Sequence, residues 1–316
     1  MQIVLIKAVV FLAPLLHALS LHAQQPVDTT FAIPIGEINQ WISIKGSSAT
    51  NPVLLFLHGG PGNSVMGYSQ KFTDQLQKNF LVVQWDQRES GKTAALNKSP
   101  QPLSVAIMEE DVIEVINYLR AKYAQEKIYL MGHSWGGFLG LLIAARRPNL
   151  LKGCIAICPM IDQRRSEAAA LEWLRGKASA GNNKLALSEL AGVRIPFENG
   201  EQLYFHRKWI NNYMGGKIPA KAMVVSWSDK WLNLFNEASA MNLFELAPSL
   251  DCPVYFFAGS KDIQTSTKLT TEYYNAVKAE SKRLFIFEGV AHNLPTSEPV
   301  KLQQTIIREV LGKFRP

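Results

Sequence analysis

Short apolar runs alternate with longer segments of helical periodicity along most of this 316-residue chain. Runs of five or six apolar residues bounded by turn-forming residues are typical of strands buried on both faces. They stand at 53–57, 80–85, 127–131, 153–158, 253–257 and 283–287. An earlier pair, 30–35 and 38–44, predicts an antiparallel hairpin. Strands that alternate with helices imply a mostly parallel sheet with right-handed crossovers, so we expect an α/β fold.

The clearest helix is expected over 104–122. Val112 and Val115 recur at helical spacing and are predicted to face the core, whereas Glu109 and Glu110 are predicted to face solvent.

Residues 162–248 interrupt the alternation, because they are far too many for a plain crossover between two strands. The segment is rich in aromatic residues and helix formers, with Gly and Pro at intervals. We expect it to form a helical cap inserted into a core made of 27–161 and 249–316.

The N-terminus is typical of a secretory signal peptide, which we place at residues 1–23. A single Lys7 precedes the apolar run Ala8–Leu16, and polar residues follow from Gln24. This run is too short to span a bilayer comfortably. We therefore expect a secreted or periplasmic protein with no stable membrane insertion once the signal is removed.

The stretch most informative about chemistry is Gly-His-Ser-Trp-Gly at 132–136, between an apolar run and a helix-forming segment. A serine on a strained strand-to-helix turn has its hydroxyl lifted above the sheet edge, as in the nucleophile elbow of α/β hydrolases. Ser134 is therefore the predicted nucleophile. A serine hydroxyl also needs a base, an orienting acid and an oxyanion hole.

Two histidines follow Ser134, namely His206 and His292. His292 lies on a loop after the run 283–287, which suits the order serine, acid, histidine, and it is the predicted base. His206 lies among aromatic residues of the expected cap and is predicted to be a packing residue.

Two aspartates follow apolar runs in the right region, namely Asp262 and Asp162. Both would project from the carboxyl ends of strands, where α/β sites are built. Asp262 is favoured as the acid because it follows the penultimate strand, whereas Asp162 is expected to cap the next helix.

The sequence His-Gly-Gly-Pro-Gly at 58–62 follows the run 53–57. Glycines let backbone amides approach a developing oxyanion closely. We expect the amides of Gly60 and Trp135 to form the oxyanion hole. A phosphate-binding loop is disfavoured, since the glycine spacing and the Lys-Ser/Thr ending of such loops are absent.

As a set, these motifs resemble the proline iminopeptidase (prolyl aminopeptidase) branch of the α/β-hydrolase superfamily. The matching stretches are 58–62, Trp-Asp-Gln-Arg at 85–88, 132–136, 259–262 and the loop that carries His292. The resemblance covers about 31–161 and 249–316. It implies an α/β-hydrolase fold with a mostly parallel sheet, and an enzyme that removes N-terminal residues, typically proline, from peptides.

The resemblance is weakest where such an enzyme would bind the substrate's amino group. In the family, the cap glutamates that hold that group sit beside a Trp-x-x-Trp-Glu pattern, which is absent here. A protonated amine in a pocket shielded from water needs a carboxylate partner. If the enzyme is an aminopeptidase, we expect Glu89, Glu167 or Glu172 to face the pocket.

The leading functional hypothesis is thus a serine-type hydrolase that acts through an acyl-enzyme, as an aminopeptidase on small peptides. The alternatives are a carboxylesterase of small acyl esters and a non-catalytic binding protein on the same fold. We expect no cofactor and no metal, since no Cys or His pair has ligand spacing.

Charge and cysteine content exclude further classes of partner and of covalent cross-link. The net charge of +7 becomes 7 − 1 = +6 without Lys7, and the basic residues are scattered, so we expect no nucleic-acid partner. Cys154, Cys158 and Cys252 are too few for a disulfide framework and are predicted to be buried thiols, with a bridge between Cys154 and Cys252 left open. The sequence does not indicate an oligomeric state.

Overall fold

The computed structural model describes residues 25–312. The predicted signal peptide, residues 1–23, lies outside the described residues. Between residues 25 and 312, no helix combines the length and the apolar character needed to cross a bilayer.

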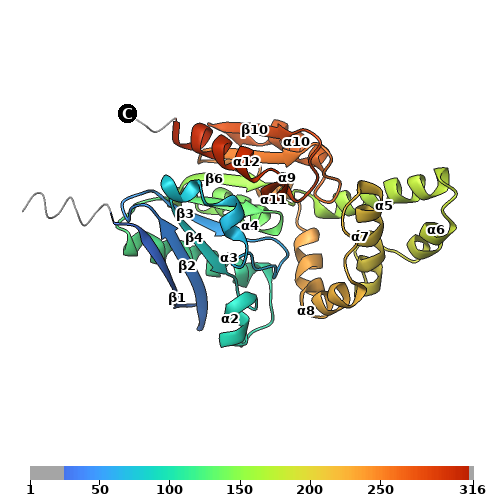
Figure 1. The fold of residues 1–316 in the computed structure, drawn as a ribbon, viewed down its shortest axis with the longest axis horizontal. Helices are drawn as coiled ribbons and strands as arrows, with labels where there is room; N and C mark the ends of the chain where they lie inside the picture. Colours follow the sequence, from blue (N-terminus) through green and yellow to red (C-terminus); the bar gives the residue numbers. More distant parts are fainter. Residues whose placement is uncertain (1–24, 313–316) are drawn as a thin grey trace, which may run out of the picture.

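The core of the protein is an eight-stranded sheet with the strand order β1-β2-β4-β3-β5-β6-β8-β10 (Figure 1). Its strands are β1 (Val27–Ile35), β2 (Ile38–Gly46), β3 (Val53–Leu57), β4 (Leu81–Asp86), β5 (Ile128–His133), β6 (Leu151–Ile157), β8 (Val254–Gly259) and β10 (Lys282–Phe287). Strands β1 and β2 form the expected hairpin, β2 pairs with β4 in antiparallel fashion, and all further pairs are parallel. The predicted α/β fold is confirmed.

Because β3 to β10 run parallel within this sheet, their carboxyl ends share one edge. Loops that leave neighbouring strands at that edge lie close together, and ligand sites of α/β proteins are built there. The five segments that carry the sequence motifs leave β3, β4, β5, β8 and β10 at this edge.

Helices cover both faces of the sheet and bury two apolar clusters. One face carries α3 (Val105–Lys122), α4 (Trp135–Arg146) and α10 (Thr267–Ala276), and the other carries η1 (Ser69–Phe72), η2 (Leu76–Lys78), α12 (Pro299–Ile306) and η4 (Ile307–Leu311). Shorter elements are α2 (Gly91–Leu96), η3 (Pro148–Leu150), α11 (Leu294–Ser297) and the small pair β7 (Ser249–Leu250) and β9 (Lys278–Ala279). This burial holds the strand ends in fixed positions.

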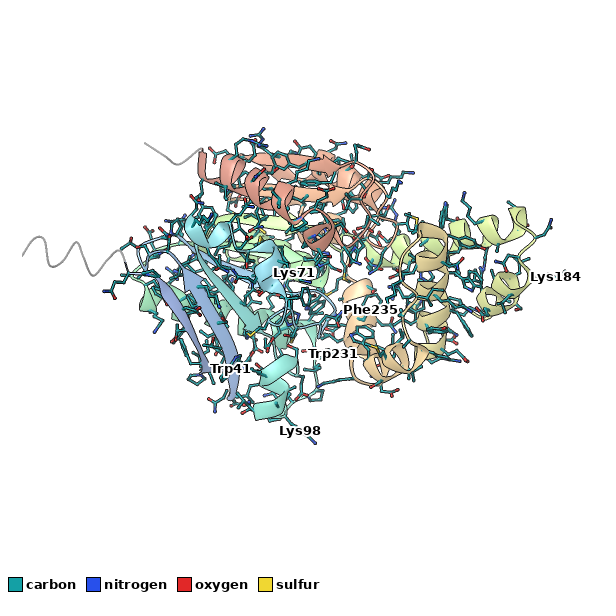
Figure 2. The ribbon with its side chains drawn as sticks, viewed as in Figure 1. Trp41, Lys71, Lys98, Lys184, Trp231 and Phe235 are labelled. Carbon is teal, nitrogen blue, oxygen red and sulfur yellow. The ribbon has the colours of Figure 1, made fainter. Side chains whose placement is uncertain are left out.

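The chain between β6 and β7 forms five helices, of which α5 to α8 stand beside the sheet at the right of Figure 1, whereas α9 lies against the core near α10. They are α5 (Gln163–Ala180), α6 (Lys184–Ala191), α7 (Gly200–Met214), α8 (Lys221–Ser239) and α9 (Leu243–Leu246). We call this segment the helical insertion. Of the helices at the right, α8 lies nearest the sheet, and its Trp231 and Phe235 lie between the sheet and the other helices (Figure 2).

Polar contacts attach α8 to the core as well. Trp227 Nε1 donates to the carbonyl oxygen of Pro61 at 2.9 Å. Lys230 Nζ lies 2.7 Å from the carboxylate of Glu89. These contacts join the helical insertion to two of the loops at the carboxyl edge of the sheet.

A buried ion pair connects the hairpin, β4 and α3. Arg88 follows β4 and donates from Nε and Nη2 to the two carboxylate oxygens of Asp111 at 2.9 and 2.8 Å. Both side chains are at most 3% exposed. Gln40 of β2 also donates to Asp111, and Arg88 donates to the carbonyl oxygen of Gly36 in the hairpin turn.

One surface prediction for α3 was wrong. Glu109 was expected to face solvent, but it is only 7% exposed. Its carboxylate accepts a hydrogen bond from Arg146 at the end of α4. The tertiary partner explains the burial, and Glu110 is exposed as expected.

The buried pair yields a stability prediction. Asp111→Ala should lower the free energy of unfolding by about 3–5 kcal/mol, because it leaves Arg88 as a buried charge without its partner. Denaturant unfolding measures the change, and Glu110→Ala on the exposed face of the same helix is the control, expected to stay within about 0.5 kcal/mol of the parent. Equal losses in both variants would show that Asp111 has no special role.

Candidate active site

Ser134 lies at the turn between β5 and α4. Its backbone has φ 58° and ψ −116°, a region that L-residues rarely occupy, as a nucleophile elbow requires. Two glycines make the turn possible. A Cβ on Gly132 would lie 2.1 Å from the carbonyl oxygen of Gly136, and one on Gly136 would lie 2.0 Å from that of Leu57. The helix α4 can therefore start directly after Ser134. Ser134 itself is 6% exposed.

His292 lies on the loop between β10 and α11 and contacts Ser134. Its Nε2 is 3.0 Å from Ser134 Oγ, and its Nδ1 is 2.8 Å from Asp262 Oδ2. Since a carboxylate only accepts, the Nδ1 atom carries a hydrogen, and Nε2 is the ring nitrogen that faces the serine hydroxyl. The structure therefore brings together the three residues that the sequence analysis selected.

Asp262 follows β8 and is 4% exposed. Its Oδ1 accepts from the backbone amides of Gln264 and Thr265 at 2.9 and 3.0 Å. Burial alone would raise the pKa of this carboxyl, but His292 and the hydrogen bonds from Thr265 hold it below its ordinary value. The carboxylate is thus ionised and has a fixed orientation.

Thr265 is a contributor that sequence reasoning missed. Its hydroxyl lies 2.9 Å from Asp262 Oδ2, 2.9 Å from the carbonyl oxygen of Cys158 and 3.1 Å from His292 Nδ1. It thus connects the acid, the histidine and the end of β6. A threonine three residues after an aspartate gives no periodic signal, although the side chain could have been expected to cap the turn.

His133, directly before Ser134, supports the loop that carries the histidine. Its Nε2 donates to the carbonyl oxygen of His292 at 3.0 Å, and the two rings lie 4.9 Å apart. Burial, and then the neighbouring His292, lower the pKa of His133 to about 4. It is therefore neutral near pH 7 and adds no charge beside His292.

The two competing sequence candidates lie elsewhere. His206 of α7 is fully buried, 3.5 Å from Glu167, and burial lowers its pKa to about 4. Asp162 caps α5, where its carboxylate accepts from the backbone amide of Arg165 at 3.1 Å.

The two expected oxyanion donors lie beside Ser134. Trp135 is the first residue of α4, so its amide is one of the helix N-terminal N–H groups with no acceptor inside the helix. Gly60 has φ 122°, and it lines the same cavity as Ser134. A side chain at Gly60 would strike the amides of Gly62 and Asn63 at 2.6 and 2.8 Å, so this tight turn requires glycine.

A cavity of about 280 Å³ opens between Ser134 and the helical insertion. Its wall combines apolar side chains of the insertion with a few polar groups near Ser134. The lining residues used below are Met160, Gln163, Leu203, Arg207, Trp227 and Phe235. No carboxylate lines the cavity within residues 25–312, and its charged side chain is Arg207.

The three glutamates considered as amine ligands are placed as follows. Glu89 pairs with Lys230, and its carboxylate also accepts from the Ser99 amide. Glu172 is exposed and lies outside the cavity. Glu167 is 1% exposed and lies behind the cavity wall, where Arg207 donates to it from Nη2 at 2.5 Å and Nη1 at 2.7 Å.

The electrostatic state of Glu167 follows from this pairing. Burial alone would raise the pKa of its carboxyl, but Arg207, together with His206 and Gln163, holds it below the ordinary value. Glu167 is thus an anion whose charge is balanced by Arg207.

Among the described residues, one group of side chains has metal-binding character. Ligand atoms of His133, Cys158 and His292 all lie within 4.8 Å of one another. Both ring nitrogens of His292 already have partners, and burial raises the pKa of the Cys158 thiol, which opposes the thiolate form that metals bind. All three cysteines are free and buried, so Cys154 and Cys252 do not form a bridge here.

Comparison with known proteins agrees with this architecture. The sequence profile described as alpha/beta hydrolase fold matches residues 52–299. The chain is 28% identical to the probable aminopeptidase YbaC of Bacillus subtilis over 300 residues, covering 87% of this chain and 94% of that protein. It is 25% identical to the proline iminopeptidase of Heyndrickxia coagulans, covering 78% and 86%. The resemblance inferred from the motifs is therefore confirmed.

Relatives with another activity match over a similar length. The monoglyceride lipase of Mus musculus is 22% identical, with 91% of this chain and 93% of that protein covered. Among solved structures, a proline iminopeptidase-related protein from Thermus thermophilus superposes with a TM-score of 0.61 at 20% identity, covering 90% and 98% of the two chains. The fold is thus shared by proteins named as peptidases and as lipases.

The close packing at the turn leads to a prediction. Gly136→Ala should lower the free energy of unfolding by about 3 kcal/mol or more, because its Cβ would strike the backbone of β3. Gly176→Ala in α5 is the matched control: a Cβ there meets nothing within 4 Å, and alanine should stabilise the helix by up to about 1 kcal/mol. Thermal unfolding of both variants measures the difference, and a tolerated Gly136→Ala would contradict the packing argument.

Proposed function

Because the chain belongs to the α/β-hydrolase fold family, we propose that it is a serine hydrolase that works through an acyl-enzyme on Ser134. The observation that carries the proposal is the connected series Ser134 Oγ, His292 Nε2, His292 Nδ1 and Asp262 Oδ2, with contacts of 3.0 and 2.8 Å. Each contact is within hydrogen-bond reach, so a proton can pass from the serine to the imidazole.

In the first half of the reaction, Ser134 Oγ attacks the substrate carbonyl carbon while His292 Nε2 takes the hydroxyl proton. The imidazolium that forms is stabilised by the buried Asp262 carboxylate. The backbone amides of Gly60 and Trp135 donate to the negative carbonyl oxygen. The tetrahedral intermediate then collapses, His292 returns the proton to the leaving group, and the acyl group stays on Ser134.

In the second half, a water molecule takes the place of the leaving group. His292 accepts its proton as the water oxygen attacks the acyl carbonyl. Collapse of the second intermediate releases the carboxylic acid and returns the proton to Ser134 Oγ. The residues and protons are thus restored after one turnover.

For the substrate, the cavity favours a small acyl ester over an amino-terminal peptide. A bound ammonium group needs a carboxylate when water is excluded, yet no carboxylate lines the cavity within residues 25–312. Arg207 lines it instead, and a cation repels a protonated amine. The apolar lining and the small volume suit a short acyl chain.

An aminopeptidase is the second candidate, supported by the names of the relatives in Bacillus subtilis and Heyndrickxia coagulans. For this activity Glu167 is the candidate anion apart from Asp262, because it lies directly behind Arg207 and Gln163 of the cavity wall. A substrate amine would have to displace Arg207 from Glu167 to reach it.

Comparing the two substrate classes directly decides between them. We expect kcat/KM for short-chain acyl esters to exceed that for amino-acid arylamides, including the proline arylamide. The opposite ranking would favour the aminopeptidase.

The proposed nucleophile can be tested by labelling as well as by turnover. Ser134→Ala should lower kcat by on the order of 10⁶, by analogy with other serine triads, and should abolish covalent labelling by a fluorophosphonate. Unchanged thermal unfolding is the control for folding. Most of the activity surviving in this variant would exclude Ser134 as the nucleophile.

The two aspartates give a separate prediction. Asp262→Asn should lower kcat by on the order of 10⁴, because His292 loses the acceptor that fixes its tautomer. Asp162→Asn removes the same charge from the cap of α5 and is expected to have a mild effect. Steady-state kinetics on one ester substrate compare them, and the reverse order would assign the acid role to Asp162.

A further inference from the structure

Arg207 is positioned by hydrogen bonds to Glu167 and His206, and Gln163 holds Glu167 in turn. Its Nη1 and Nη2 atoms donate to the two carboxylate oxygens of Glu167 at 2.7 and 2.5 Å. Nη1 also lies 2.8 Å from Nδ1 of His206, which accepts because it is neutral. Gln163 donates to Glu167 at 2.7 Å and to the carbonyl oxygen of Gln264 at 2.8 Å. The guanidinium is thus connected to the loop between Asp262 and Thr265.

The hydrogen bonds of Arg207 leave one edge of the guanidinium without a partner. Arginine has five N–H donors in a planar fork. Glu167 and His206 take both donors of Nη1 and one of Nη2. Among residues 25–312, the Nε donor and the second Nη2 donor have no acceptor. These two donors are adjacent and parallel, the arrangement that binds a carboxylate through both oxygens.

This free edge belongs to a residue of the cavity wall. Arg207 lines the cavity that also contains Ser134, and its side chain is 13% exposed. Apolar residues of the same wall, among them Met160, Leu203 and Phe235, would contact the methylene groups of a ligand that extends from Ser134 to Arg207. With a volume of about 280 Å³, the cavity is near the lower end of the range for ligand pockets, so the two ends of a bound molecule are only a few atoms apart.

Resting on the proposed hydrolase function, we propose that Arg207 determines specificity by binding a carboxylate at the far end of the acyl group, so that the preferred substrates are half-esters of short dicarboxylic acids. The ester carbonyl lies at Ser134, the methylene chain lies along the apolar wall, and the free carboxylate accepts from Nε and Nη2 of Arg207. Glu167 is a positioning residue, since it holds the guanidinium without occupying this edge.

A salt bridge that serves only to stabilise the helical insertion would predict different kinetics. It would affect the stability of the protein and the turnover of all substrates alike. A carboxylate site makes the charge of the substrate decisive. The quantity to measure is therefore a preference ratio, namely kcat/KM for monoethyl glutarate divided by kcat/KM for the neutral ethyl 4-carbamoylbutanoate, which has the same length and shape.

The main variant replaces both partners, Glu167→Gln with Arg207→Gln, because removing Arg207 alone would leave Glu167 as a buried unpaired charge. The preference ratio should be about 100 in the parent and fall to about 1 in the double variant, as expected for loss of a charge-assisted two-point contact. Arg194→Gln is the matched control. It removes the same charge from an exposed site of the helical insertion, outside the cavity, and should leave the ratio unchanged.

Calorimetric binding of monoethyl glutarate to Ser134→Ala gives a readout that does not depend on turnover, and adding the double replacement should weaken this binding by a similar factor. A parent enzyme without preference for the anionic ester, or a double variant that keeps the preference, would overturn the proposal even if Ser134 is labelled by a fluorophosphonate. If neither labelling nor turnover occurs, the hydrolase function fails, and calorimetry alone decides whether Arg207 binds a carboxylate.

Discussion

The close approach of α4 to the ends of β3 and β5 is the constraint on which the candidate site depends. Neither Gly132 nor Gly136 has room for a Cβ atom, because backbone carbonyl oxygens lie where it would stand. This packing fixes the unusual backbone of Ser134 and places the N-terminus of α4 directly behind its side chain. The strain is retained because the strands and helix around it are fully buried.

The polar groups around His292 depend on that constraint in turn. Ser134 follows β5, Asp262 follows β8 and His292 lies on the loop after β10, so their mutual distances are set by the register of the four neighbouring parallel strands β5, β6, β8 and β10. Thr265 and His133 then restrict the remaining freedom of the acid and of the histidine loop. Such support from neighbouring side chains holds reactive groups in position before a substrate arrives.

Nearly all strands of the sheet could be predicted from the sequence, because a buried strand appears as an unbroken apolar run with turn-forming residues on either side. The sequence analysis also selected the residues that meet at Ser134. Each of them follows a predicted parallel strand, and the ends of such strands lie at one edge of the sheet. Contacts between charged side chains that lie far apart in the sequence could not be inferred in this way. The burial of Glu109 depends on Arg146, that of Asp111 on Arg88, and the neutralisation of Glu167 on Arg207, forty residues away. Periodicity reports which face is apolar, but not which charge will find a partner.

The contact between the glycine-rich loop and α8 has a consequence for how this protein can diverge. A side chain at Gly62 would overlap the ring of Trp231, with its Cβ 2.2 Å from the nearest ring atom, and Trp227 binds the neighbouring carbonyl oxygen of Pro61. A larger residue at position 62 therefore requires a change at Trp231 of α8. A helical insertion transplanted from a relative would fit only with its matching loop. Evolutionary drift in substrate preference is less restricted in α5 and α7, which contribute Gln163 and Arg207 to the cavity wall without this steric tie to the loop.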